Sequence, residues 1–476
     1  MADLRSANTR LERDSMGEMP VPAEALYGAS TARAIENFPI AHRPLPCEVI
    51  HAFGHLKAAC AKANRDLGRL DAARADAIIA AAEEVAVGRH DAHFPVDVYQ
   101  TGSGTSTNMN ANEVIATLAN QRLGQGATPG SKLPGVHPND HVNSGQSSND
   151  AFPTAMHIAA ADAVAHRLIP ALGRLAKELD AKAAQWDHIV KVGRTHTMDA
   201  TPIRVGQVFS GYAAAAHYAV QRATQAYDAM RGNLPIGGAA VGTGINTHPD
   251  FARKVCEHLE ASVKLPFREA ANHYEAQAAK DSFVDAHGLL KTIAISLGKI
   301  ASDIRLLGSG PRCGVGELVL PATQPGSSIM PGKVNPVICE SVVQVQCRVI
   351  GNDAAIAALN LGGVGSIFEL NVGMPPMVDA FLESVNLLAN VTQVFIDKLL
   401  AGLAVDEARC RELLDRSLMT VTALAPALGY DVAARLAKRA MKENATIRAV
   451  VLDEGLMPAA ELDALLDPDA MTRPKA

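Results

Sequence analysis

The chain has 476 residues, of which 48% are hydrophobic and 20% are charged, and its net charge at pH 7 is −6. This balance is typical of a globular protein, and the length predicts two or three packed units. The negative net charge offers no basic field for nucleic acid or an anionic membrane, and aromatic residues, at 4%, are too few for stacking on single-stranded nucleic acid.

The start of the chain and its cysteines indicate the compartment. Residues 1–20 carry scattered charges without an apolar core, which argues against a signal peptide. No apolar run approaches the ~20 residues that a membrane span needs. The seven cysteines include no Cys-x-x-Cys pair, so reduced thiols are favoured over a disulfide framework or a zinc site. The sequence therefore predicts a cytoplasmic protein.

Up to about residue 144 the pattern is broken, with short helices and polar loops. Residues 101–108 (TGSGTSTN) contain five hydroxyl side chains, directly before a predicted helix. A helix N-cap needs only one hydroxyl, and the surplus suits a carboxylate or phosphate held at the start of a helix.

A second polar segment, residues 146–150 (QSSND), precedes Pro153, where a helix could begin. Asn149 or Asp150 alone would make an ordinary N-cap, while the additional donors again suit an anion. From Pro153 onward, apolar residues recur at helical spacing and predict one helix of roughly 28 residues. Its apolar seam consists of Val164, Leu168, Leu172, Leu175 and Leu179.

Residues 193–196 (GRTH) lie between helical stretches and are interpreted as a third polar loop. His196 is by default a structural histidine, and it becomes an acid or base candidate only as part of a larger polar group. Two further seams predict long helices over residues 290–307 and 376–399, which favours a bundle of extended helices that subunits can share. These seams consist of Leu290, Ile293, Leu297, Ile300, Ile304 and Leu307, and of Val378, Phe381, Val385, Leu388, Phe395 and Leu399.

Residues 326–336 (GSSIMPGKVNP) lie between the last two predicted helices. Their prolines disfavour a helix and their glycines disfavour a strand, so the segment is predicted to be a shaped loop. Ser327, Lys333 and Asn335 place a candidate nucleophile or base beside groups that can hold an anion. The alternative is a glycine-rich surface connection with incidental polar residues.

Taken together, four polar loops in a helical chain are interpreted as one composite site for a small anion. They contain no metal-ligand pattern, no Gly-x-x-x-x-Gly-Lys-Ser/Thr phosphate loop and no dinucleotide fingerprint. This pattern predicts acid–base chemistry on a polycarboxylate without a cofactor or metal.

The loop at residues 326–336 resembles the signature loop of the fumarase/aspartase superfamily, and the resemblance extends over nearly the whole chain. Within the superfamily the chain most resembles class II fumarases. Thr195 is followed by His196 where aspartases place glutamine, and Ser148 stands where aspartases place threonine. The other matching segments are residues 14–17, 21–23, 37–40, 101–113, 137–140, 147–150, 193–196, 242–244, 368–371 and 466–468.

The resemblance implies an all-α fold of three domains, with a central five-helix bundle that forms a twenty-helix core in a homotetramer. Each active site is then built from loops of three subunits. The expected domains are an N-terminal lyase domain at 1–144, a central helical-bundle domain at 145–404 and a small C-terminal helical domain at 405–476.

The resemblance also implies a reaction, the reversible hydration of fumarate to (S)-malate through an aci-carboxylate intermediate, with no cofactor. Ser327 is the expected base, Lys333 stabilises negative charge, and His196 with its partner Glu340 handles the departing hydroxide. The residues expected to bind the substrate are Ser103, Thr105, Ser147, Ser148, Asn149, Thr195 and Asn335. His137, Asn139 and Asp140 match a secondary dicarboxylate site, although a turn with an Asn or Asp cap explains them equally well.

Three alternatives stay open. Ala239 and Gly373 stand where fumarases have larger residues, so a broader hydratase acting on mesaconate or methylmalate is the first. Aspartate ammonia-lyase is the second, and it conflicts with His196. The third is a catalytically silent binding or structural member, which the joint presence of the catalytic residues argues against.

Overall fold

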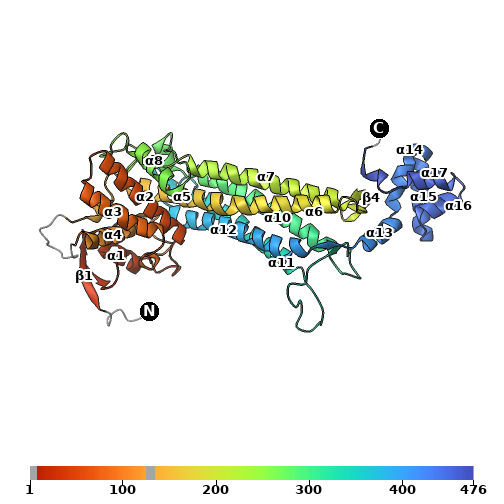
Figure 1. Ribbon diagram of the computed structural model, residues 1–476, viewed down its shortest axis with the longest axis horizontal. Coiled ribbons are helices and arrows are strands. Elements are labelled where there is room, and N and C mark those ends of the chain that lie inside the picture. Colours follow the sequence, from red (N-terminus) through yellow and green to blue (C-terminus); the bar gives the residue numbers. More distant parts are fainter. Residues whose placement is uncertain (1–7, 125–134, 475–476) are drawn as a thin grey trace. The chain divides into compact units, whose positions relative to one another are not determined.

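The computed structural model describes residues 8–124 and 135–474, and these are predominantly helical (Figure 1). The chain divides into two compact units, each assembled from stretches that are distant in sequence. Unit 1 consists of Met1–Pro170, Gln221–Ala294 and Cys347–Ala389, and unit 2 of Ala171–Val220, Ile295–Gln346 and Asn390–Ala476.

Unit 1 opens with short elements packed around two helices, α2 (Cys47–Asp66) and α3 (Ala72–Ala86). Both helices are rich in alanine, the strongest helix former. Gly54 allows the two helices to approach closely, because a Cβ atom at this position would lie only 2.3 Å from the backbone nitrogen of Ala86. Besides parts of the long helices, this unit contains β1 (Thr9–Asp14), β2 (Gly17–Pro22), α1 (Ala29–Asn37), α4 (Thr105–Arg122), α5 (Ser148–Ala163), α8 (Phe251–Val263), α9 (His273–Ala278), β6 (Ser366–Ile367) and β7 (Leu370–Asn371).

Long helices make up most of the remaining chain, as the apolar seams predicted. Helix α5 continues through a π-helical turn at Val164–Leu168 into α6 (Ile169–Gln185), so the predicted run beyond Leu179 is confirmed. All five seam residues from Val164 to Leu179 are 0% exposed. The other long helices are α7 (Val205–Arg231), α10 (Asp281–Leu307), α11 (Val337–Leu359) and α12 (Met374–Lys398).

Within unit 1 the long helices are joined by aromatic and polar contacts. Phe283 of α10 packs edge-on against His157 of α5 and Phe381 of α12, with ring centroids 5.0 and 5.3 Å apart. His287 of α10 bonds through its two ring nitrogens to Asp353 of α11 and Ser384 of α12, at 3.1 and 2.8 Å. These contacts fix how each helix is rotated about its own axis.

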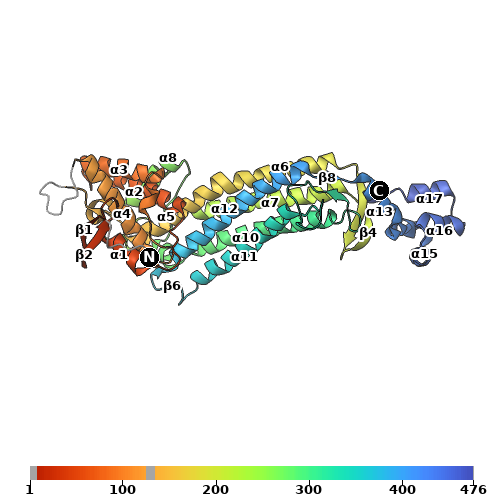
Figure 2. The ribbon, with the colours of Figure 1, turned by 90° about the horizontal axis from the view of Figure 1, so that it is seen from below.

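Within unit 2, α6 lies beside the last part of α12, from Asn390 onward (Figure 2). Arg174 of α6 donates to Gln393 of α12 at 2.6 Å and pairs with Asp397 one turn later. Tyr212 of α7 donates to Asp303 of α10 at 2.9 Å. The short strands β5 (Leu318–Val319) and β8 (Ala404–Val405) pair antiparallel in the same unit.

The last part of the chain forms a cluster of short helices, which Figure 2 shows in blue. Residues 418–466 share an apolar core of their own that includes Leu424, Leu436 and Leu462, each 0% exposed. Among the residues that the structure describes, no helix is both long and apolar enough to cross a bilayer. The helices are α13 (Glu407–Arg416), α14 (Ala425–Leu428), α15 (Tyr430–Glu443), α16 (Ile447–Asp453) and α17 (Ala459–Leu465).

One sequence interpretation was wrong. The segment around residue 194 was expected to be a loop, but it forms a hairpin of two antiparallel strands, β3 (Val190–Thr195) and β4 (Met198–Arg204). Gly193 permits this pairing, because a Cβ atom there would lie 2.4 Å from the carbonyl oxygen of Thr201. The hairpin therefore holds Thr195 and His196 at a defined tip.

Candidate active site

The start of α4 brings together the first group of predicted residues. Gly104 has φ +71° and is the residue before the helix, and a Cβ atom there would lie 2.0 Å from the Phe152 ring. The hydroxyls of Ser103 and Thr105 are 2.8 Å apart, and the Thr105 hydroxyl is 2.7 Å from that of Ser148. Two polar loops that are distant in sequence thus form one row of hydroxyls.

The second loop is organised by a capping box. Helix α5 begins at Ser148, not at Pro153 as the sequence suggested, and Ser147 is its N-cap. The Ser147 hydroxyl accepts from Asn149 N at 3.2 Å, while Asp150 accepts from Ser147 N at 2.8 Å. Ser147, Ser148 and Asn149 therefore lie at a helix N-terminus, whose dipole favours an anion.

Asp150 also ties this helix start to a neighbouring turn. Its second carboxylate oxygen accepts from Gly237 N and Ala239 N at 3.0 and 2.9 Å. Burial raises the pKa of Asp150 to about 7, although its backbone hydrogen bonds act in the opposite direction. Asn149 donates to the Ala240 carbonyl at 2.9 Å, which reinforces the same junction.

Sequence reasoning missed a buried lysine behind these two loops. Lys57 of α2 donates to the side-chain oxygens of Asn108, Asn143 and Gln146 at 2.8, 2.9 and 2.9 Å. A signal was present, because Lys57 follows Phe53 by four residues and thus shares the buried face of α2. A lysine at such a position needs a polar partner.

The predicted secondary site stands on an exposed turn. His137, Asn139 and Asp140 belong to or precede the π-helical turn Pro138–Val142, and all three are exposed. His137 Nδ1 lies 3.2 Å from the Asp140 carboxylate, and the His137 N–H donates to His141 Nδ1 at 2.7 Å. These contacts are local to the turn.

In unit 2, Thr195 and His196 stand at the tip of the β3–β4 hairpin. Thr195 pairs with Met198, so His196 and Thr197 form a two-residue turn with φ values of +56° and +64°. Such turns require left-handed backbone, which normally selects Asn or Gly. A histidine and a β-branched threonine in this conformation store strain, as residues at functional sites often do.

The fully buried carboxylate of Glu317 stabilises the hairpin by pairing with two basic side chains of β3. Glu317 accepts two parallel bonds from Arg194 at 2.9 and 3.0 Å, and Lys191 Nζ lies 3.0 Å from the same carboxylate. Burial lowers the pKa of Lys191. The Glu317 N–H donates to the Leu307 carbonyl at 2.9 Å, so the hairpin is fixed to the end of α10.

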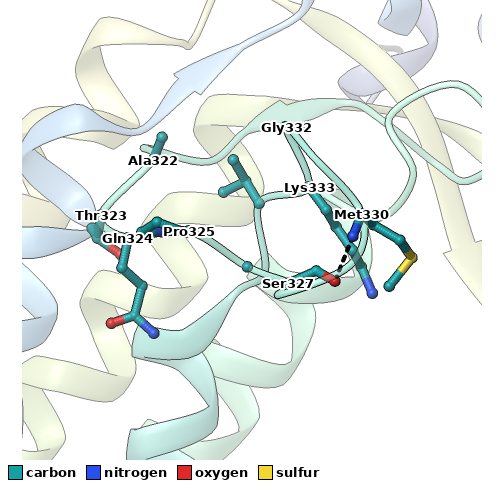
Figure 3. Close-up of a pocket in the computed structure, with 10 residues that line it drawn as sticks. Ala322, Thr323, Gln324, Pro325, Ser327, Met330, Gly332 and Lys333 are labelled. Carbon is teal, nitrogen blue, oxygen red and sulfur yellow. Dashed lines mark hydrogen bonds between the residues drawn. The ribbon is translucent and has the colours of Figure 1, made fainter.

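The loop at residues 326–336 is a shaped loop, as predicted (Figure 3). The half-buried Ser327 hydroxyl oxygen accepts from Ile329 N at 3.2 Å and Met330 N at 3.0 Å. Asn335 donates to the Gly326 carbonyl at 2.6 Å, and Gly326 N donates to the Lys333 carbonyl at 2.8 Å, which closes the loop. A hollow of about 400 Å³ is lined by Ala322, Thr323, Gln324, Pro325, Gly326, Ser327, Met330, Gly332, Lys333 and Val334.

Glu340 lies exposed in the first turn of α11. No hydrogen bond or ion pair joins Glu340 to His196 in residues 8–124 and 135–474, so the expected pair is not made within one chain. The predicted residues fall into two sets. The unit 1 set consists of Ser103, Thr105, Ser147, Ser148, Asn149 and the 137–140 turn, and the unit 2 set of Thr195, His196, Ser327, Lys333, Asn335 and Glu340.

The two small residues behind the broader-hydratase alternative have packing explanations. A Cβ atom at Gly373 would lie 2.9 Å from the Leu359 carbonyl oxygen, so glycine allows a close backbone approach there. Ala239 is buried, and its N–H is bound to Asp150. Neither observation reveals added space for a methyl group.

One cluster of metal-ligand type residues lies outside the polar loops. Cys47, His51 and Asp91 bring potential ligand atoms within 4.8 Å of one another. The His51 ring nitrogen already pairs with Asp91 at 3.1 Å, and the Cys47 thiol with Glu48 at 3.5 Å. Cys47 and His51 come from α2, and Asp91 begins the short helical turn Asp91–His93.

Comparison with known proteins places this arrangement in context. Residues 17–351 match a family described as Lyase, and residues 421–473 match one described as Fumarase C C-terminus. The chain is 52% identical over 468 residues to a class II fumarate hydratase of Corynebacterium glutamicum, covering 97% of this chain and 96% of that one. It is also 52% identical over 476 residues to the class II fumarate hydratase of Mycobacterium tuberculosis, covering 99% and 98%.

A solved structure agrees with these sequence matches. The crystal structure of class II fumarase from Schistosoma mansoni superposes with a TM-score of 0.94 at 37% identity, and the match covers 98% of this chain and 100% of that chain. The helical architecture described above is thus the architecture of that enzyme.

Proposed function

Because the chain belongs to the lyase family that includes the class II fumarate hydratases, we propose that it catalyses the reversible hydration of fumarate to (S)-malate. The observation that carries the proposal within the site is the environment of Ser327. Two backbone N–H groups donate to its oxygen, and this arrangement favours the alkoxide over the neutral hydroxyl.

In the dehydration direction, the Ser327 alkoxide takes the C3 proton of malate. The electron pair left on carbon moves into the adjacent carboxylate, which becomes a doubly charged aci-carboxylate. Lys333, which is exposed on the same loop, and Asn335 stabilise that charge. Their contribution to the rate comes from binding the intermediate more strongly than the substrate.

In the second step the electron pair returns to form the double bond, and the C2–O bond breaks. His196, with Thr195 beside it, supplies the proton that lets hydroxide leave as water. Glu340 orients the imidazole of His196. Because these two side chains do not meet within one chain, the pair is proposed to form between subunits.

The hydroxyl row of unit 1 is proposed to bind the carboxylates of the substrate. Ser103, Thr105, Ser147, Ser148 and Asn149 supply donors at the starts of α4 and α5, where helix dipoles add to the attraction. His137, Asn139 and Asp140 are proposed as a secondary dicarboxylate site, which their exposure to solvent supports.

The proposed assembly is a homotetramer in which subunits share sites, and the proposed division of the chain is 1–144, 145–404 and 405–476. The separate apolar core of α14–α17 supports the last boundary.

The proposed compartment is the cytoplasm, which suits seven cysteines that form no disulfide bonds.

The function is tested by ultraviolet absorbance of purified protein mixed separately with malate, aspartate and methylmalate, without added cofactor or metal. Absorbance that grows with malate alone, from the new conjugated double bond, is the expected result. Comparable growth with methylmalate would make the enzyme a broader hydratase. Growth with aspartate would overturn the role of His196, and no growth with any of them would overturn the proposed function.

A further inference from the structure

Lys57 is a charged residue that the mechanism above does not use. It is 0% exposed, and it stands in the middle of α2. Its three hydrogen-bond acceptors, on Asn108, Asn143 and Gln146, are all neutral amide oxygens. Within the described residues, no carboxylate forms an ion pair with Lys57, and the buried Asp150 carboxyl interacts with its charge without direct contact.

The geometry indicates that Lys57 carries its proton. An ammonium group has three N–H donors, and three oxygens surround Nζ at 2.8 to 2.9 Å. A neutral amine would direct its lone pair at one of these oxygens and lose that bond. Burial lowers the pKa of Lys57 to about 8, which leaves the ammonium form dominant at neutral pH.

The three amides connect the two helix starts that hold the hydroxyl row. Asn108 lies in the first turn of α4, which begins at Thr105. Asn143 and Gln146 lie just before α5, and Asn143 Nδ2 donates to the Gln146 carbonyl at 3.0 Å. Asn108 Nδ2 also donates to Asn143 Oδ1 at 3.2 Å, so one ammonium group organises both segments.

We propose that Lys57 is a positioning residue of the dicarboxylate site. Its ammonium group holds Asn108, Asn143 and Gln146 together, and thereby sets the Thr105 and Ser148 hydroxyls side by side. Its charge, which no contacting carboxylate neutralises, also makes this surface more favourable for a substrate carboxylate. The inference rests on the proposed function, because it concerns how the same site binds fumarate.

This role predicts a separation of binding from chemistry. Lys57 acts on the carboxylate-binding hydroxyls, whereas Ser327 and His196 perform the proton transfers. Loss of Lys57 should therefore weaken substrate binding more than it lowers the turnover rate of the bound substrate. A merely structural lysine would lower stability without changing the relation of KM to kcat.

The test is the full-length Lys57→Met variant, which keeps the length of the side chain and removes the charge. We expect KM for fumarate to rise about 10- to 100-fold, because charge-assisted hydrogen bonds are lost, while kcat falls by less than roughly fivefold. We also expect succinate, an unreactive dicarboxylate, to raise the melting temperature of the variant less than that of the unsubstituted protein. Lys62→Met is the control and should change neither value, because this half-buried lysine lies on the same helix as Lys57 but pairs with Glu83 of α3.

A second variant covers the case in which Lys57→Met does not fold. Gln146→Met removes one half-buried acceptor and should raise KM in the same direction by a smaller factor. Unchanged KM and an unchanged succinate shift in whichever variant folds would overturn the role of Lys57. A failure of the proposed function is distinguished from this outcome, because there the unsubstituted protein itself would show no fumarate turnover.

Discussion

Ser327 and Ser328 are adjacent residues in the same loop, but their hydroxyl groups differ in burial and in hydrogen bonding. Ser327 is half-buried and accepts two backbone N–H bonds, while Ser328 is exposed. Donors that converge on an oxygen stabilise its anion, and this makes Ser327 the better base. The distinction comes from loop geometry, which the sequence letters Ser-Ser do not contain.

Ser327→Ala should therefore lower kcat about 10²–10⁴-fold, the usual contribution of a positioned base, while Ser328→Ala should stay close to the unsubstituted enzyme. Initial rates of fumarate hydration measure both variants, with circular dichroism to show that each is folded. Equal activities for the two variants would remove Ser327 from its proposed role.

The turn at the hairpin tip carries its own prediction. Thr197 has φ +64°, a conformation that costs a β-branched residue about 1–3 kcal/mol. Thr197→Gly relieves this strain and loses part of the gain through the greater freedom of glycine in the unfolded chain. We expect a net stabilisation of about 1 kcal/mol with His196 retained, measured as the shift in a denaturant unfolding curve. A variant that is less stable than the parent would contradict the strain argument.

At the residue scale, side chains in the polar loops were predictable from the sequence, because clustered hydroxyls and glycines exceed what a cap or turn needs. The role of Lys57 was not, because its position on the buried face of α2 indicates only that this lysine needs a polar partner, not which residues supply it. Only the partners, brought from residues 108, 143 and 146, reveal what the lysine does.

At the scale of elements, long helices were the part of the fold that the sequence predicted best. Each long seam recurs at helical spacing over many turns, and such periodicity has no other stable interpretation in an ordinary globular chain. The hairpin over Val190–Arg204 was missed because two short strands depend on each other's hydrogen bonds. A single strand of this kind, interrupted by Gly193, carries little local signal.

His157, a buried histidine of helix α5, makes the stability of the folded chain depend on pH. His157 is 1% exposed, its Nδ1 bonds to the Met230 carbonyl at 2.6 Å, and burial lowers its pKa to about 4. The unfolded chain binds a proton at this residue below about pH 6.5, and the folded chain resists doing so. The folded state is therefore favoured at higher pH and loses stability as pH falls from about 6.5 toward 4.

Between pH 7 and pH 5 this one residue should cost about 2 kcal/mol of unfolding free energy. His157→Asn keeps a donor for Met230 and removes the titration, so the variant should lose less stability over the same interval. Denaturant unfolding at both pH values measures the difference. His166→Asn, which changes an exposed histidine paired with Asp162, is the matched control and should not reduce the loss of stability between pH 7 and pH 5.

At the scale of the whole molecule, the long helices expose large apolar side chains that one chain does not cover. Ile295, Leu306, Ile350 and Val394 are between 40% and 54% exposed. Apolar side chains spaced along long helices are typical of surfaces that bind other subunits. This supports the proposed tetramer, because assembly would remove these side chains from water.

Light scattering after size exclusion should accordingly give a mass close to four times 50.0 kDa. Ile295→Arg places a charge on the exposed apolar surface and should shift the population toward smaller species at micromolar concentration. Val87→Arg changes a side chain that is 66% exposed beyond the end of α3, and it should leave the mass unaltered. A monomeric parent protein would rule out the shared-site arrangement.

The placement of the predicted residues in two units of one chain has a consequence for mixtures of defective proteins. Ser327→Ala damages the unit 2 set, and Thr105→Val damages the unit 1 set. If each site takes these sets from different subunits, random co-assembly of the two variants leaves about one site in four with both sets intact. Co-expression should then recover activity that neither variant has alone, whereas a self-contained site would recover none. Two loss-of-function alleles of this gene would, in that case, complement each other within a single cell.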